Sequence, residues 1–256
     1  MVSNKNFQID IFEAGQDVSA DPQDYCDLAK RQKLPFLFPG ATPSERFVLD
    51  DDGRFEYYGR EKFREVYEAT KSMSFRGTRK YFLHGTFGAG KSHMLAALAC
   101  LLNKEAFRVV YLPDCREMLG DVFVYLHSAL HLTFMGSVEH LEYLSDCNTT
   151  SELLDFCLKV SSEIRLFFII DQVNALDPTD EATDRFPPER KREVRSILDS
   201  ITAMHLKLSS SSGNYQHALH DTYRQTGEKR IYLYGGLSTV CFFKRNTYNP
   251  GLTLTD

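Results

Sequence analysis

The sequence predicts an α/β protein in which a parallel sheet carries helices on both faces. Two observations support this fold class: apolar runs of strand length alternate with longer segments of helical periodicity, and the run within 165–171 is continuous. Continuous apolar runs are typical of strands that are buried on both faces of a sheet. The composition suits such a domain, because 43% of the 256 residues are hydrophobic and 25% are charged.

The expected elements follow one another along the chain. The expected strands are 79–84, 107–112, 165–171 and 230–234. We expect five helices. The first opens at 57–61 and reaches about residue 71, and the second starts near residue 91. The other three span about 116–134, 151–163 and 189–208. Prolines make 175–188 a loop, and the serines of 209–214 predict a flexible segment.

Both ends of the chain depart from this alternation. Residues 1–50 are rich in proline, with one dense apolar patch at 34–38, so we expect an irregular extension that lies across a main domain of residues 51–256. Only 16 residues follow Val240. We therefore expect a sheet that is truncated at its C-terminal edge, without a normal fifth strand and helical lid.

The most informative motif lies between the first expected strand and the helix that follows it. Its residues match the pattern G-x-x-x-x-G-K-[ST] and are Gly85, Thr86, Phe87, Gly88, Ala89, Gly90, Lys91 and Ser92. Glycines let the backbone fold around a phosphate chain with its N–H groups pointing inward, and the helix N-terminus adds a positive dipole end. Lys91 then reaches the outer phosphates, Ser92 holds Mg²⁺, and His93 completes the expected contact segment. The motif predicts a P-loop NTPase that binds ATP and Mg²⁺.

A metal-linked carboxylate is the second requirement of such a site, and Asp171 meets it. This residue ends the continuous apolar run 166–170, and open parallel sheets place ligands at the carboxyl ends of their strands. We expect the strands 79–84 and 165–171 to be near neighbours, with Ser92 and Asp171 sharing one hydrated Mg²⁺.

Gln172 stands where many ATPases of this class carry a glutamate that polarises the attacking water. An amide cannot accept a proton at any useful pH, although it can orient water. Three alternatives stay open: slow hydrolysis, use of another carboxylate, or binding without turnover. Glu228, just before the last expected strand, is a weak candidate for the base.

Three strings of the sequence carry a family resemblance. Gly85–Met94, Val109–Arg116 and Phe168–Leu176 resemble the ATPase module of Crinkler-type and retrotransposon-hot-spot-type proteins of fungi, oomycetes and trypanosomatids. The resemblance covers about residues 50–240. It implies an ATP-binding domain of the AAA/STAND-like division with central strand order 5-1-4-3-2. It also implies that Tyr58–Glu61 is similar to a Gly-Arg element that such ATPases place near the adenine.

Composition and charge limit the kinds of partner and the cellular location that we expect for this chain. The formal charge of -5 disfavours nucleic acid, and no apolar run approaches the length of a membrane span. The six cysteines are scattered, and the N-terminus lacks a secretory signal, so we expect an intracellular protein of the cytoplasm or nucleus. Besides an ATPase, the sequence allows an effector or interaction protein that uses ATP as a conformational switch, with a protein partner or self-association. A nucleic-acid-directed motor is a third reading.

Other side chains are weaker candidates. Arg116 and Arg224 could act as trans-acting arginines in an oligomer. His127 and His131 are spaced as a metal pair on an expected helix, but no third ligand accompanies them.

Overall fold

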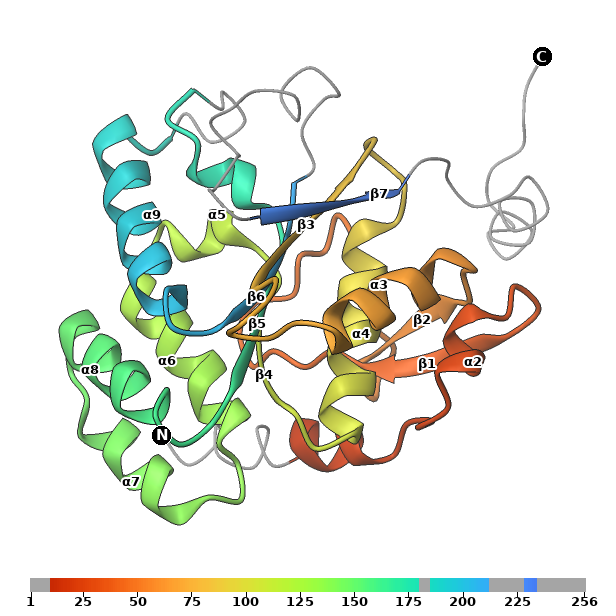
Figure 1. The fold of residues 1–256 in the computed structure, drawn as a ribbon, viewed down its shortest axis with the longest axis horizontal. Coiled ribbons are helices and arrows are strands. Elements are labelled where there is room, and N and C mark those ends of the chain that lie inside the picture. The colour runs from red at the N-terminus through yellow and green to blue at the C-terminus, as the bar shows by residue number, and fades with distance from the viewer. Residues whose placement is uncertain (1–9, 180–184, 212–227, 234–256) are drawn as a thin grey trace.

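A five-stranded parallel sheet forms the centre of the computed structural model, which describes residues 10–179, 185–211 and 228–233 (Figure 1). Its strands, in spatial order, are β4 (Arg108–Leu112), β5 (Leu166–Ile170), β6 (Leu206–Ser210), β3 (Lys80–Gly85) and β7 (Glu228–Leu233). All four pairings are parallel. Numbered along the chain from β3, the order is 5-1-4-3-2, as the family resemblance implies. The α/β prediction is confirmed.

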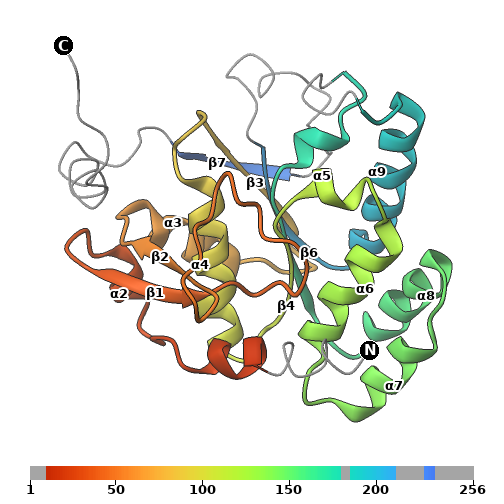
Figure 2. The same cartoon turned by 180° about the vertical axis from the view of Figure 1, so that it is seen from behind.

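Helices cover both faces of the sheet. On one side lie α3 (Lys62–Lys71) and α4 (Lys91–Lys104), and on the other α6 (Val122–Thr133), α7 (Val138–Asp146), α8 (Thr150–Val160) and α9 (Pro188–Thr202) (Figures 1 and 2). The shorter helices are α2 (Pro22–Cys26), α5 (Cys115–Met118) and the 3₁₀ turn η1 (Val173–Leu176). A further helical segment spans 10–16.

Helix α4 is the central helix of the fold. Every residue from Met94 to Leu102 is buried. A helix that is apolar all round must be covered on all sides. The sheet covers one side of α4, and the segment before α3 covers the other: β1 (Arg31–Pro35) pairs antiparallel with β2 (Arg54–Tyr58), and both strands contact α4.

The N-terminal segment differs from its expected form. By N-terminal segment we mean the chain before α3. We expected residues 1–50 to be irregular, whereas they contain α2 and β1. The helix expected to open at 57–61 begins only at Lys62, because β2 reaches Tyr58. The patch 34–38 supplies Leu34, Phe36, Leu37 and Phe38 to the same hydrophobic cluster as the sheet.

The largest errors lie in the C-terminal half. The helix expected over 189–208 ends at Thr202, and the buried strand β6 begins at Leu206. The strand was missed because Lys207 and Ser209 interrupt its apolar pattern, although both side chains are buried. With β6 as the fourth strand, β7 is the fifth, so the expected lack of a fifth strand is wrong.

One expected helix divides in two. The segment 116–134 breaks between α5 and α6, where the Asp121 carboxylate accepts a hydrogen bond from the Val124 N–H and caps the second helix. Helix α7 was not expected.

Candidate functional site

The carboxyl ends of four neighbouring strands meet at one edge of the sheet. Asp114 follows β4, Asp171 follows β5, Ser210 ends β6 and Gly85 ends β3. Because these strands are parallel and adjacent, their carboxyl ends lie side by side. Ser210 therefore sits between the two predicted halves of the site, on the strand that the sequence did not predict.

The loop between β3 and α4 depends on its glycines. Gly88 and Gly90 have φ angles of 75° and 77°, in the left-handed region that other residues rarely adopt. A Cβ on Gly85 would lie 2.1 Å from the carbonyl oxygen of Leu233 in β7. The loop can thus turn back over the sheet and start α4 at Lys91.

Lys91 is the buried cation of this loop. Its Nζ donates to the carbonyl oxygens of Gly85 at 2.8 Å and Thr86 at 2.7 Å. Burial lowers the pKa of Lys91, and the nearby Asp171 carboxylate acts in the opposite direction. The ammonium is therefore held among loop carbonyls, within the field of the predicted metal-linked carboxylate.

The Gly-Arg element contacts the same loop. Arg60 donates from Nη1 to the Ala89 carbonyl oxygen at 2.7 Å. A Cβ on Gly59 would lie 1.9 Å from the Asp27 carbonyl oxygen, so only glycine fits where β2 passes the end of α2. This close approach places Arg60 beside the loop.

A cleft of about 390 Å³ opens at this edge of the sheet. It brings together loop and strand residues that the sequence predicted, namely Phe87, Gly88, Gly90, Lys91, Ser92, His93, Asp171 and Gln172. The other lining residues come from the N-terminal segment and are Glu45, Arg46, Val48, Glu56, Tyr57, Tyr58 and Arg60. Of the remaining loop residues, Gly85 and Ala89 are buried and Thr86 is exposed. The strands β3 and β5, which we expected to be near neighbours, are separated by β6. The phosphate-loop motif after β3 and Asp171 after β5 nevertheless line the same cleft.

Asp171 is buried, and both of its carboxylate oxygens accept hydrogen bonds. Oδ2 accepts from Arg46 Nη1 at 2.8 Å. Oδ1 accepts from the Gln172 N–H at 2.9 Å and from the Ser210 hydroxyl. Two distant parts of the chain and the adjacent backbone N–H thereby fix the orientation of this carboxylate.

Gln172 has an uncommon backbone conformation. Its φ of 61° is left-handed, which is rare for a residue with a side chain, and the residue immediately precedes η1. Backbone strain of this kind is often found at functional sites, where the surrounding structure enforces it. The side chain is buried and borders the cleft.

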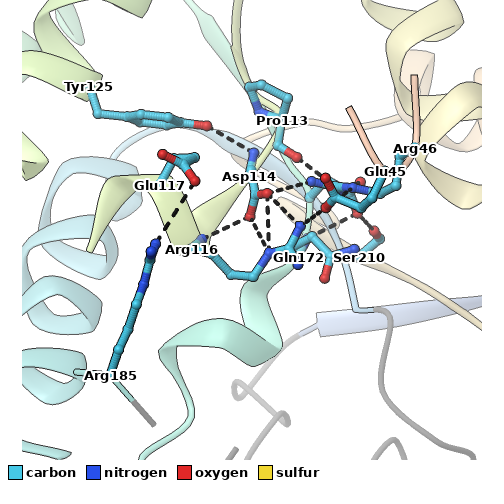
Figure 3. Close-up of polar contacts among 11 residues, drawn as sticks. Glu45, Arg46, Pro113, Asp114, Arg116, Glu117, Tyr125, Gln172, Arg185 and Ser210 are labelled. Atoms are coloured by element: carbon cyan, nitrogen blue, oxygen red, sulfur yellow. Dashed lines mark hydrogen bonds and ion pairs between the residues drawn. The ribbon is translucent and has the colours of Figure 1, made fainter. Parts of the chain in front are cut away.

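Arg46 connects two carboxylates across the end of the sheet (Figure 3). Besides its bond to Asp171, the guanidinium donates from Nη2 to Asp114 Oδ2 at 2.6 Å and from Nη1 to the Pro113 carbonyl oxygen at 3.1 Å. Arg116 also reaches Asp114, through Nη2 at 2.7 Å. Burial raises the pKa of Asp114 to about 6, although Arg46 and the Arg116 N–H act to lower it.

The sequence did not reveal Arg46 or Ser210 as site residues. Arg46 is 125 residues from Asp171 in the chain, in a segment without a recognisable motif. Asp114 had an available signal, because it lies two residues after an apolar strand, within the string Val109–Arg116.

Several weaker predictions are not supported. Glu228 is in register with Lys80, at the end of the sheet opposite Gly85, so its backbone position argues against a role as base. His127 binds the Leu144 carbonyl oxygen at 2.8 Å, and the described residues contain no group of His, Cys, Asp or Glu suited to a metal. Arg116 is engaged with Asp114, and Arg224 lies outside the described residues.

Comparisons with known proteins identify no relative: no protein-family model matches the chain, and no curated protein matches it significantly. None of the helices in the described part of the chain has the length and apolarity that a membrane crossing requires.

Proposed function

We propose that this chain is an ATP-binding P-loop NTPase module, of the kind that its three sequence strings resemble. One observation carries the proposal. Lys91 and Ser92 of a complete phosphate-loop motif line the same cleft as Asp171, at the carboxyl edge of a parallel sheet.

The donor chemistry of the cleft fits a nucleotide. The loop offers backbone N–H groups, a helix N-terminus and the ammonium of Lys91 to phosphate oxygens. The glycine conformations at 88 and 90 serve a loop that wraps a ligand. The cleft volume of about 390 Å³ also falls in the range of small-molecule sites.

The same residues fit Mg²⁺ in the way that nucleotide sites use it. Magnesium is usually bound through one or two protein oxygens, with water and phosphate supplying the rest. Ser92 and Asp171 would be these protein ligands, and bound Mg²⁺ would neutralise charge on the phosphates. The absence of a larger ligand cluster among the described residues is consistent with this mode.

Hydrolysis, if it occurs, is slow in this proposal. Gln172 borders the cleft beside Asp171 and can orient water through its amide, but it cannot accept a proton. Lys91 and the loop N–H groups hold the phosphates, and Asp171 is fixed by Ser210 and the Gln172 N–H.

A second candidate is an effector or interaction protein that uses bound ATP as a switch without efficient turnover. Two observations favour it: the residue next to Asp171 is an amide, and Asp171 already holds the guanidinium of Arg46. Turnover under saturating ATP separates the two candidates.

Calorimetry of Mg²⁺–ATP binding tests the proposal. Lys91→Ala removes the cation of the loop, so we expect affinity to fall at least about tenfold, or about 1.4 kcal/mol. Lys104→Ala is the matched control, because it removes a half-buried lysine, bonded to the Gln16 carbonyl oxygen, from the other end of the same helix. Equal affinity of the Lys91→Ala variant and the parent would refute the assignment of the loop.

A further inference from the structure

The cationic partner of Asp171 is the starting observation. Within the described ranges, Arg46 is the only side chain that forms an ion pair with this carboxylate. The guanidinium binds Oδ2, whereas Oδ1 accepts from Gln172 and Ser210. The proposed function gives Asp171 to Mg²⁺. A guanidinium and a divalent ion on the same carboxylate repel each other, so the two cations compete there.

Arg46 has a second anchor that does not involve Asp171. Its Nη2 binds Asp114, and Asp114 is itself held by the backbone N–H and side chain of Arg116. The two nitrogens bind carboxylates that follow different strands, β4 and β5. Arg46 can therefore give up Asp171 and still be kept at the mouth of the cleft by Asp114.

The guanidinium also has the chemistry and the position of a phosphate ligand. Arg46 lines the cleft together with Lys91 and Ser92. Its Nε is buried and donates no hydrogen bond within the part of the chain that the structure describes. The Glu45 carboxylate lies 3.3 Å from this Nε and forms an ion pair with it. A planar guanidinium presents several N–H donors in a fixed fork that matches phosphate oxygens.

We propose that Arg46 is a phosphate-binding residue of this cleft. Its guanidinium pairs with the Asp171 carboxylate until a metal ion binds that carboxylate instead. After this exchange, Asp114 keeps the guanidinium beside the bound phosphates. Besides Lys91 and Arg60, which also line the cleft, Arg46 would then be a further cationic ligand supplied in cis. This inference rests on the proposed function.

A purely structural role is the competing explanation, in which Arg46 only ties the N-terminal segment to the sheet. Both explanations weaken nucleotide binding, but they predict opposite changes in the affinity for the metal alone. Loss of a structural tie would weaken metal binding and nucleotide binding together. Under the proposed exchange, removing Arg46 relieves Asp171 of a competing cation, so the metal alone binds more tightly while the nucleotide loses a contact.

The experiment measures binding of Mn²⁺ alone and of Mn²⁺–ATP to the full chain by calorimetry. For Arg46→Gln we expect about threefold tighter Mn²⁺ binding and about tenfold weaker Mn²⁺–ATP binding. Arg46→Lys keeps the charge but cannot bridge both carboxylates, so it should lie between the parent and Arg46→Gln. Arg54→Gln is the matched control, because Arg54 belongs to the same segment, pairs with Asp17 and does not line the cleft.

The outcomes are separable. Both affinities falling in Arg46→Gln, or neither changing, would overturn the role of Arg46 while leaving the phosphate loop intact. Urea unfolding of each variant identifies a folding defect, and Arg46→Lys then carries the comparison. If the parent itself fails to bind Mn²⁺–ATP, the proposed function is refuted, and the inference falls with it.

Discussion

Asp114 has an environment in which burial opposes neighbouring charge. Arg46 and the Arg116 N–H stabilise the carboxylate, whereas Asp171, Glu117 and desolvation favour the protonated form. The buried Tyr125 hydroxyl accepts a hydrogen bond from the Asp114 N–H at 2.8 Å (Figure 3). Burial is the largest influence, so the pKa of Asp114 rises from its ordinary value of 3.8 to about 6.

This shift predicts how stability depends on pH. Between pH 4 and 6 the native chain keeps a proton on Asp114 that the unfolded chain has released, so stability falls as the pH rises. The loss amounts to about 3 kcal/mol when it is complete. Urea unfolding of the parent and Asp114→Asn at pH 4.5, 5.5 and 7 isolates this contribution. The parent should lose stability relative to Asp114→Asn across that range, and a constant difference would contradict the prediction.

Turnover is expected to depend on Gln172. Gln172→Glu would place a carboxylate beside Asp171 at the edge of the cleft, where it can accept a proton from water. We expect a several-fold faster steady-state release of phosphate at saturating ATP, with nearly unchanged ATP affinity, because the proposal gives this group the attacking water and not the phosphates as its partner.

The control for this measurement is Gln172→Asn, which keeps an amide and should not accelerate turnover. A Gln172→Glu variant that binds ATP normally but is no faster than the parent would favour the switch function over the enzyme.

Residues of local motifs could be predicted, whereas residues joined by the fold could not. Lys91 and Ser92 lie in one short pattern, and Asp171 directly follows an apolar strand, so the sequence alone was sufficient to select them as candidates. Arg46 and Ser210 reach Asp171 only through tertiary structure, from segments far away in the chain. Nothing in the nearby sequence distinguishes them from other arginines and serines.

At the scale of elements, the burial pattern decides what the sequence predicts. β5 is apolar throughout, and β3 and β4 each contain an apolar run of at least three residues. No expected limit of these three strands differs from the observed one by more than one residue. β6 contains Lys207, a lysine that remains buried because its Nζ lies 3.5 Å from the Asp199 carboxylate on α9. Because the burial of this lysine depends on an ion pair formed in the folded protein, the sequence of β6 does not read as an apolar run.

The β1–β2 pair illustrates the same limit. β1 reads Arg-Gln-Lys-Leu-Pro and is largely exposed in its first half, so its pattern is weak. Its partner strand and the apolar surface of α4 stabilise it, and both are tertiary features. The apolar surplus of α4 was an available signal, because the sheet alone cannot cover a helix that is buried on every side.

At the scale of the whole molecule, aromatic rings connect the N-terminal segment to the sheet and to the phosphate loop. Phe36 contacts Tyr111 of β4 edge-on at 5.9 Å, and Phe47 stacks on His93 of α4 at 4.7 Å. Phe55 of β2 contacts both Phe47 and His93. Arg46 precedes Phe47, so the same anchoring sets the position of the guanidinium. The described residues share one hydrophobic cluster, which favours a single cooperative unit.

The final prediction tests whether this anchoring couples stability to the site. Phe47→Leu should lower the free energy of unfolding by roughly 1–2 kcal/mol, in one transition, because it leaves a cavity in a shared core. It should also weaken Mg²⁺–ATP binding several-fold, since Arg46 and His93 both depend on this ring. Phe156→Leu is the matched control: Phe156 is equally buried but lies on α8, where it packs against Phe134 at 5.2 Å. That variant should lose similar stability and keep the parent affinity. Two separate unfolding transitions would show that the segment and the sheet fold independently. Equal ATP affinities of the two variants would show that the segment covers the sheet without positioning the site.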